Sequence, residues 1–346
     1  MNRIPYPGRL AALAGLALAS QAILAGQAIA EAEESERYPQ VTVGGAVEVE
    51  AYHASPFTGS DESDIVLATG ALGLEAAINE WITAEISTLY EENDTPLEID
   101  TASVMLGAED SVWSARAGQF YVPFGVYETA MVSDPLTLEL GETRETAIAA
   151  GIGQGGFNAE VYAFNGDLDD ENQVDNVGAT AGWAGNVGEA ELALSAGYMN
   201  SLGESDGIEG TIEESTDEVG AWTASATLGL GEAMLVGEYL TASDSFRASE
   251  LAFDGDGARP AAWNVEASYG FDLIGRPARA GIGYQGTDEA LALELPESRV
   301  IAALSVEIFP HTALSFEYAA DEDYDVADGG TGESAGTFLT QLAVVF

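Results

Sequence analysis

The chain has 346 residues, of which 59 are Asp or Glu and 10 are Arg, and it contains neither lysine nor cysteine. Its formal charge of −49 argues against binding to nucleic acid or another polyanion, because phosphate groups would be repelled. The lack of cysteine excludes disulfides and cysteine-ligated metal sites. A hydrophobic fraction of 47% and 40 glycines indicate a folded all-β chain rather than an acidic disordered one.

Residues 1–30 have the layout of a secretory signal peptide. Two arginines precede an apolar run at 10–19, and Ala28-Ile29-Ala30 is a small-x-small cleavage site. A membrane anchor is the competing interpretation, but the run is interrupted at 20–21 and is shorter than a spanning helix. We expect cleavage after Ala30, a short N-terminal segment at 31–39, and export to a Gram-negative periplasm or outer membrane.

From residue 40 onward, apolar and polar residues alternate in segments separated by turns, which is typical of transmembrane β-barrels. Strands are expected at 40–54, 63–78, 81–92, 97–107, 112–122, 143–153, 156–164, 177–185, 190–201, 219–230, 233–242, 260–273, 277–285, 298–309, 312–322 and 336–346. Seven tight turns alternate with eight longer, mostly acidic loops. The sequence therefore predicts an all-β, 16-stranded antiparallel transmembrane β-barrel over residues 40–346, with short periplasmic turns and long acidic extracellular loops.

Aromatic residues gather near both ends of the expected strands. A tyrosine lies near the long-loop end of every second strand, at Tyr52, Tyr90, Tyr121, Tyr162, Tyr198, Tyr239, Tyr284 and Tyr318, and all but Tyr52 and Tyr162 fall on the apolar face. Trp222 and Trp263 share that level, and Trp81, Trp113 and Trp183 lie near the tight turns. We interpret these residues as two interfacial girdles against outer-membrane lipids and lipopolysaccharide. Ordinary enrichment of aromatics in sheets is the alternative.

The last expected strand places Phe338, Leu342, Val344 and Phe346 on one face. A terminal aromatic residue that closes an alternating strand resembles the assembly signal of bacterial outer-membrane barrels. The barrel-assembly machinery is therefore an expected partner through the strand that ends at Phe346.

Few residues suggest enzymatic or metal chemistry. Gly151, Gly153 and Gly156 match G-x-G-x-x-G, but a hairpin and a strand follow rather than a helix, so a dinucleotide site is disfavoured. His53 and His311 are too few for a histidine metal site. The acidic run 167–176 lacks the glycine and glutamate of an EF-hand, and a solvated loop is favoured over a weak divalent-ion site. We expect no enzyme activity, no cofactor and no resident metal.

The third long loop is apolar for a surface segment. Residues 118–147 read GQFYVPFGVYETAMVSDPLTLELGETRETA, and such a loop would be costly in water. Folding into the lumen would bury it and narrow the pore, with the constriction loop at about residues 123–143. The alternative is an outer lid that packs on the barrel rim or on a neighbouring subunit.

This loop resembles the corresponding region of the LbtU-type siderophore porins. The match is densest at 123–125 (PFG), 133–138 (SDPLTL) and 142–146 (ETRET), and weaker similarity extends from VTVGGAVEVEA to the terminal Phe. The resemblance implies a sixteen-stranded outer-membrane porin for siderophore uptake. Family members often begin the mature chain with a coiled-coil stretch, whereas only residues 31–39 precede the first expected strand here.

The polar strand faces nominate the residues that line the lumen. The acidic ones are Glu48, Glu50, Glu85, Glu160, Glu191, Glu238, Glu266 and Glu317, and the basic ones are Arg116, Arg279 and Arg299. The expected constriction residues are Arg116, Phe124, Tyr127, Asp134, Glu139, Glu142 and Arg144. One hypothesis places Arg116 and Arg144 opposite the loop acids across the constriction. The alternative pairs these arginines with acids of the lumen wall.

The expected function is an outer-membrane porin that passes small solutes by diffusion, with iron–siderophore uptake implied by the resemblance. The alternatives are a general cation-preferring porin and a phosphate-type porin, although a phosphate channel would want lumenal lysines. An enzymatic barrel would need a catalytic Ser/His or Asp/His arrangement, which two histidines barely allow. A structural or adhesive barrel would have a plugged lumen. The sequence leaves the oligomeric state open, a trimer included. Acidic walls would oppose the entry of an anionic siderophore.

Overall fold

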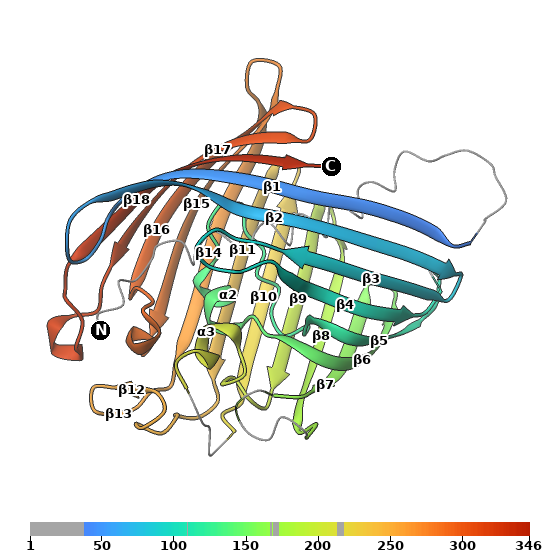
Figure 1. Cartoon of the computed structure of the whole chain (residues 1–346), viewed down its shortest axis with the longest axis horizontal. Helices are drawn as coiled ribbons and strands as arrows, with labels where there is room; N and C mark the ends of the chain where they lie inside the picture. Colours follow the sequence, from blue (N-terminus) through green and yellow to red (C-terminus); the bar gives the residue numbers. More distant parts are fainter. Residues whose placement is uncertain (1–37, 109, 167, 169–172, 213–217) are drawn as a thin grey trace.

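Sixteen antiparallel strands close into a barrel (Figure 1). The computed structural model describes residues 38–108, 110–166, 168, 173–212 and 218–346. The barrel strands are β1 (Gln40–Ser55), β2 (Glu62–Asn79), β3 (Ile82–Leu89), β4 (Glu98–Leu106), β5 (Trp113–Tyr121), β6 (Arg144–Gln154), β7 (Phe157–Phe164), β8 (Asn176–Val187), β9 (Ala190–Met199), β10 (Ala221–Leu230), β11 (Ala233–Ala242), β14 (Ala261–Asp272), β15 (Pro277–Asp288), β16 (Ser298–Phe309), β17 (Thr312–Glu322) and β18 (Ser334–Val345). Each strand pairs with the next barrel strand along the chain, and β18 pairs with β1 to close the ring.

Short elements occupy the long loops. They are the helices α2 (Leu136–Gly141) and α3 (Asp206–Glu209), the 3-10 turns η3 (Leu291–Leu293) and η4 (Val326–Asp328), and a two-stranded ribbon of β12 (Ala252–Phe253) and β13 (Asp256–Gly257). Figure 1 shows α2 within the ring of strands and α3 beside it. Within the described residues, no helix is long and apolar enough to cross a membrane.

The sixteen expected strands are all confirmed, with ends displaced by a few residues. Alternation explains the agreement, because successive side chains of a strand point to opposite faces. In β1, Val41 and Val49 are 57% and 38% exposed on the outer face, whereas Glu48 is 2% exposed inside. The register of β1 with β2 shifts at Glu48/Val49. The expected signal peptide (1–30) and most of the segment 31–39 lie outside the described residues.

The tight turns use residues that tolerate left-handed backbone. Gly155 and Gly156 have φ of 61° and 86° between β6 and β7, as a two-residue hairpin turn requires. The G-x-G-x-x-G match is therefore a hairpin, as the sequence predicts. His311 has φ of 61° in the turn between β16 and β17, which is consistent with a turn residue.

Aromatic pairs lie near both ends of the outer barrel surface. The rings of Tyr198 and Trp222 are tilted at 46° with centroids 4.5 Å apart, and Trp81 stacks on Trp113 at 6.2 Å near the tight turns. One assignment to the apolar face is wrong. Tyr121 donates a hydrogen bond from its hydroxyl to Asp100 Oδ1 at 2.8 Å inside the barrel, because it ends β5 where the chain turns inward.

The last residue extends the seam between β1 and β18 by one backbone pair. Gly45 and Phe346 exchange backbone hydrogen bonds of 2.9 and 3.0 Å between β1 and the chain end. A Cβ at Gly45 would lie 2.7 Å from the Ala71 carbonyl oxygen and 2.8 Å from the Phe346 ring. Glycine at this position therefore leaves room for the Phe346 ring beside β1.

Candidate channel and its constriction loop

Loop three, residues 122–143, folds into the barrel, as the sequence predicts. It leaves β5 at Tyr121, crosses the lumen, forms α2 and rejoins the wall at β6. Helix α2 packs against β11, β14 and β15, and also against α3 of the fifth long loop. The third loop thus lies against one side of the lumen rather than capping the rim.

Three glutamates of the barrel wall hold this loop by its backbone. Glu238 of β11 accepts hydrogen bonds from the N–H groups of Val126 and Tyr127 at 2.8 and 3.0 Å. Glu266 of β14 accepts the N–H of Ala130 at 2.9 Å. A hydrogen bond to a carboxylate is stronger than one between neutral groups. We name these residues, together with Glu317, the carboxylate latch.

Glu317 of β17 completes the carboxylate latch. It accepts the N–H groups of Val132 and Ser133 and also the Ser133 hydroxyl. Next to it, Gln285 of β15 accepts the N–H of Leu136 at 3.0 Å. Glu238, Glu266 and Glu317 are at most 5% exposed, so their charge is directed to loop amides rather than to a passing solute. Their contact with loop amides has no local signal in the sequence.

An apolar core forms behind the loop. Phe124, Leu136 and Leu140 are buried against side chains from the neighbouring long loops. Most apolar residues of the loop are therefore covered, whereas Val126 stays 46% exposed. Tyr127 has φ of 55°, and its ring lies so close to Gly125 that a Cβ there would be 2.2 Å from the ring. Phe124 belongs to this core and does not line the open space.

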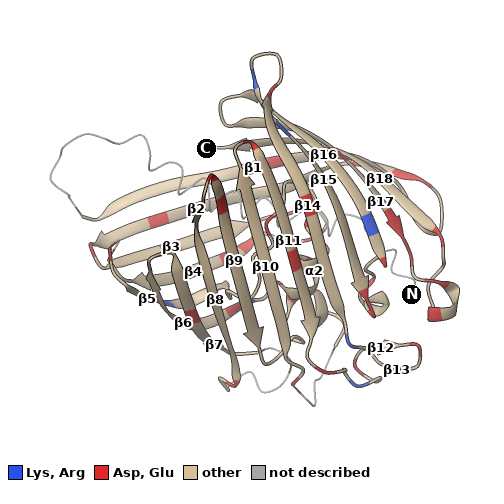
Figure 2. Ribbon diagram, turned by 180° about the vertical axis from the view of Figure 1, so that it is seen from behind, with Lys and Arg blue, Asp and Glu red and all other residues tan. Residues whose placement is uncertain are grey.

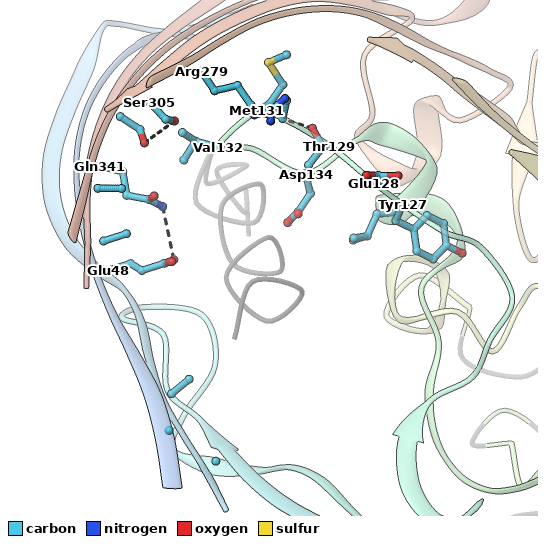
Figure 3. Close-up of a pocket in the computed structure, with 18 of the residues that line it drawn as sticks. Glu48, Tyr127, Glu128, Thr129, Met131, Val132, Asp134, Arg279, Ser305 and Gln341 are labelled. Atoms are coloured by element: carbon cyan, nitrogen blue, oxygen red, sulfur yellow. Dashed lines mark hydrogen bonds between the residues drawn. The ribbon is translucent and has the colours of Figure 1, made fainter. Parts of the chain in front are cut away.

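The barrel encloses an open chamber of about 1960 Å³ between loop three and the opposite wall. Its lining carboxylates are Glu48, Glu75, Glu85, Asp100, Glu128, Asp134, Glu142, Glu232, Asp272 and Glu307. The lining cations are Arg116 and Arg279, which makes ten acids against two arginines. Figure 3 shows Asp134 between the wall of Glu48 and Gln341 and the loop residues Tyr127 and Glu128. In Figure 2, acidic positions outnumber basic ones along the coloured part of the ribbon.

The arginines take partners on the barrel wall. Arg116 forms a salt bridge with Glu85, donates to Ser103 Oγ at 2.9 Å and lies 4.3 Å above the Phe120 ring. Its guanidinium thus neutralises a neighbouring wall carboxylate. Of the two arrangements expected from the sequence, Arg116 adopts the pairing with an acid of the lumen wall, not the one with a loop acid across the constriction.

Arg144 shows the same behaviour at the start of β6. Its Nη1 lies 2.6 Å from Glu98 and 3.6 Å from Asp100. Arg299 is buried and binds Asp321 with two hydrogen bonds of 2.8 and 2.9 Å. Neither Arg144 nor Arg299 is among the residues that line the chamber.

The remaining candidates for the lumen differ in burial and in whether they line the chamber. Glu48 and Glu50 are each 2% exposed, and Gln341 donates to both at 3.5 and 2.9 Å. Arg279 lines the chamber and donates to Ser268 Oγ at 3.0 Å. Glu139, Glu160 and Glu191 lie outside the chamber lining. Half of the acidic run 167–176 falls outside the described residues. The described ranges hold no group of three metal-ligating side chains placed for an ion.

A buried carboxylate lies in the second long loop. Glu91 is 5% exposed, and its carboxylate accepts the Thr95 hydroxyl at 2.5 Å. Burial raises the pKa of Glu91 to about 7, the Thr95 bond opposes the shift, and nearby Asp94, Asp100 and Glu98 add to it. This loop therefore carries a group that titrates near neutrality, which sequence analysis did not single out.

Relatives of the chain share most of its length. It is 33% identical to a UPF0422 protein of Legionella pneumophila strain Philadelphia 1, over 89% of this chain and 67% of the relative. The chain belongs to the UPF0422 family. A UPF0422 protein of Coxiella burnetii is 28% identical over 83% of this chain and 65% of its own length. No family model matches the sequence.

Solved structures show that this UPF0422 member has the porin fold. An anion-selective porin from Comamonas acidovorans superposes with a TM-score of 0.62 at 14% identity, covering 89% of this chain and all of that one (100%). The outer-membrane channel DcaP of Acinetobacter baumannii gives a TM-score of 0.60 at 13% identity over 91% and 99% of the two chains. OmpF of Salmonella typhi gives 0.61 at 12% identity over 89% and 98%.

Proposed function

We propose that this UPF0422 protein is an outer-membrane channel, not an enzyme, which passes small solutes by diffusion and prefers cations. The observation that carries the proposal is the closed barrel around a chamber of about 1960 Å³ lined by ten carboxylates and two arginines. Rings of carboxylates attract cations in a pore. One of the two arginines, Arg116, is already paired with Glu85.

A phosphate-type porin is disfavoured by the same lining. An anion path needs unpaired positive groups along the pore. Arg279, the other chamber arginine, donates to Ser268 Oγ and forms no salt bridge within the described residues. The experiment is to reconstitute the purified full chain in liposomes and follow swelling in neutral sugars of increasing size. We expect uptake of small sugars with a sharp size limit. A lumen closed to every sugar would contradict the proposal.

Siderophore uptake is a second candidate, supported by the resemblance of loop three to LbtU-type siderophore porins. The residues of densest resemblance include Ser133 and Thr137, which contact the carboxylate latch. The shared motif therefore supports a shared loop architecture, and its residues act here in holding the loop. Because the chamber is acidic, we propose that any ferric complex that passes is neutral or positively charged.

The siderophore proposal is tested by current block in planar bilayers. A neutral or cationic ferric hydroxamate complex should reduce the potassium current at micromolar to millimolar concentration, whereas a triply anionic ferric catecholate complex should not. Conductance without block by either class would leave a general cation-preferring porin.

The outer surface supports membrane placement and assembly partners. The aromatic pairs at both ends, such as Trp81–Trp113 and Tyr198–Trp222, suit the two interfaces of a bilayer. We propose contact with outer-membrane lipids and lipopolysaccharide, and assembly through the strand that ends at Phe346. Deleting Phe346 should slow assembly in vivo, measured by the fraction of heat-modifiable folded barrel.

A further inference from the structure

A second contact holds loop three beyond the stretch that the carboxylate latch binds. Loop five joins β9 to β10, and its helix α3 packs beside α2 (Figure 1). The N–H of Asp206 donates to the carbonyl oxygen of Glu142 at 2.9 Å. The Asp206 side chain accepts the N–H of Arg144 through Oδ1 at 3.1 Å. The amides bound by the latch end at Ser133, so Asp206 holds the later part of the loop, where it rejoins β6.

Loops three and five pack backbone against backbone. A Cβ added at Gly207 of α3 would collide with the carbonyl oxygen of Glu139 on α2. Ile208 of α3 and Leu140 of α2 are fully buried in the same apolar core. Because Glu142 lines the chamber, a movement of loop three away from α3 would change the shape of the pore.

Carboxyl groups are concentrated at this contact. The charged and titratable groups around Asp206 are Glu209 on α3 itself, Tyr127, Glu139 and Glu142 on loop three, Asp100 on β4, and Arg144 on β6. The Arg144 guanidinium is directed to Glu98 and Asp100. Acids therefore outnumber the arginine in this group, and they repel one another when all are ionised.

Burial sets how this contact responds to pH. It raises the pKa of Asp206 to about 6, the backbone bond and charge of Arg144 oppose the shift, and Glu209 and Asp100 add to it. Burial also raises the pKa of Glu142 well above its usual range, and neighbouring acids, Asp206 first, add to that shift. The docked loop thus favours neutral Asp206. Its contribution to docking is fully present below pH 3.8 and is lost as the pH rises through about 6.

We propose that Asp206 is a positioning residue that makes the width of the pore depend on pH. Protonation at the carboxyl cluster tightens the contact between loops five and three, and ionisation loosens it. The inference rests on the proposed channel and adds its regulation. From the raised pKa of Asp206, the ratio of docked to undocked loop five should be about tenfold higher at pH 5 than at pH 7.5.

A single introduced thiol can report undocking, because the chain contains no cysteine. Ser205 at the start of α3 is fully buried, so Ser205→Cys should react with a water-soluble thiol reagent only when loop five lifts. Ser245→Cys, exposed on the loop after β11, gives the rate of a free thiol at the same pH. With the folded full chain in detergent, we expect the ratio of the first rate to the second to fall about tenfold from pH 7.5 to pH 5.

Variants assign the pH dependence to Asp206. Asp206→Asn keeps an acceptor oxygen for the Arg144 N–H but removes the titrating carboxyl. In the Ser205→Cys chain it should keep the rate ratio low at both pH values. Asp244→Asn changes an exposed acid of another long loop and is the matched control, which should leave the tenfold change in place. Equal ratios at the two pH values, or an undiminished change in Asp206→Asn, overturn the inference.

Conductance separates this inference from the proposed function. In planar bilayers we expect more open-channel current noise at pH 7.5 than at pH 5, and Asp206→Asn should remove the difference. A conducting channel with the same noise at both pH values overturns the regulation and leaves the proposed channel standing. A chain that conducts no ions refutes the proposed function and any control of the pore, while the thiol rates still decide whether Asp206 governs the docking of loop five.

Discussion

Removing one carboxylate of the latch should free part of loop three inside the barrel. The change is Glu317→Ala, and Glu317 is the residue that accepts two loop N–H groups and the Ser133 hydroxyl. Glu317 is 2% exposed, so water cannot replace it easily. The N–H groups of Val132 and Ser133 would then be buried without an acceptor.

The size of the effect follows from these three hydrogen bonds. A hydrogen bond to a charged group contributes about 1.5–3 kcal/mol, and an unsatisfied buried donor costs about 1–3 kcal/mol. Because the bonds share one carboxylate and are not additive, we expect a loss on the order of 3–6 kcal/mol of docking free energy for this part of the loop. A loss of about 3 kcal/mol shifts the ratio of docked to undocked loop about a hundredfold.

Single-channel recording measures this shift. We expect Glu317→Ala to raise the mean conductance and the open-channel noise, and to expose loop three to protease in detergent. Glu317→Gln keeps one carbonyl acceptor and should lie between Glu317→Ala and the unmodified chain. Glu75→Ala is the matched control, because Glu75 lines the chamber but belongs to β2, outside the latch. If Glu317→Ala shows the conductance, noise and protease resistance of the unmodified chain, the latch does not position the loop.

Three further changes test other parts of the account. A raised pKa means that the folded state favours neutral Glu91. The contribution of Glu91 to the free energy of unfolding is therefore fully present below pH 4.5 and is lost as the pH rises towards about 7. The loss is on the order of 3 kcal/mol. Glu91→Gln should flatten this pH dependence of thermal unfolding in detergent, and an equally steep curve would contradict the assignment. Gly45→Val should clash with the Phe346 ring and cost about 1–3 kcal/mol, seen as a lower yield of heat-modifiable barrel, whereas a normal yield would refute the seam argument. Arg116→Gln should free the charge of Glu85 and increase the K⁺/Cl⁻ permeability ratio, and an unchanged ratio would show that Arg116 does not influence selectivity.

The barrel was predictable because each strand has one face towards lipid and one face towards the barrel interior. An outer face against lipid and an inner face against water impose a period of two, visible in Val41 and Val49 against Glu48. The glycines Gly155 and Gly156 mark a hairpin turn between two such strands. Loop three was predictable for a related reason, since its apolar residues require cover.

The roles of the lumenal charges were not predictable from the sequence. Alternation places Glu48, Glu85 and Glu238 on the same inner face, but it cannot tell that Glu85 meets Arg116 and Glu238 meets loop amides. Those partners lie up to 112 residues apart in the chain, so no local pattern links them. The inward turn of Tyr121 was missed because the path of the loop, rather than the strand alternation, sets its direction.

The central claim is that the acidic chamber selects cations, and the reversal potential across a KCl gradient tests it most directly. With the purified full chain in a planar bilayer, we predict a reversal potential that moves towards the K⁺ equilibrium potential and weakens when Glu75 and Glu128 of the lining are changed to glutamine. A reversal potential near zero or on the Cl⁻ side would contradict the account.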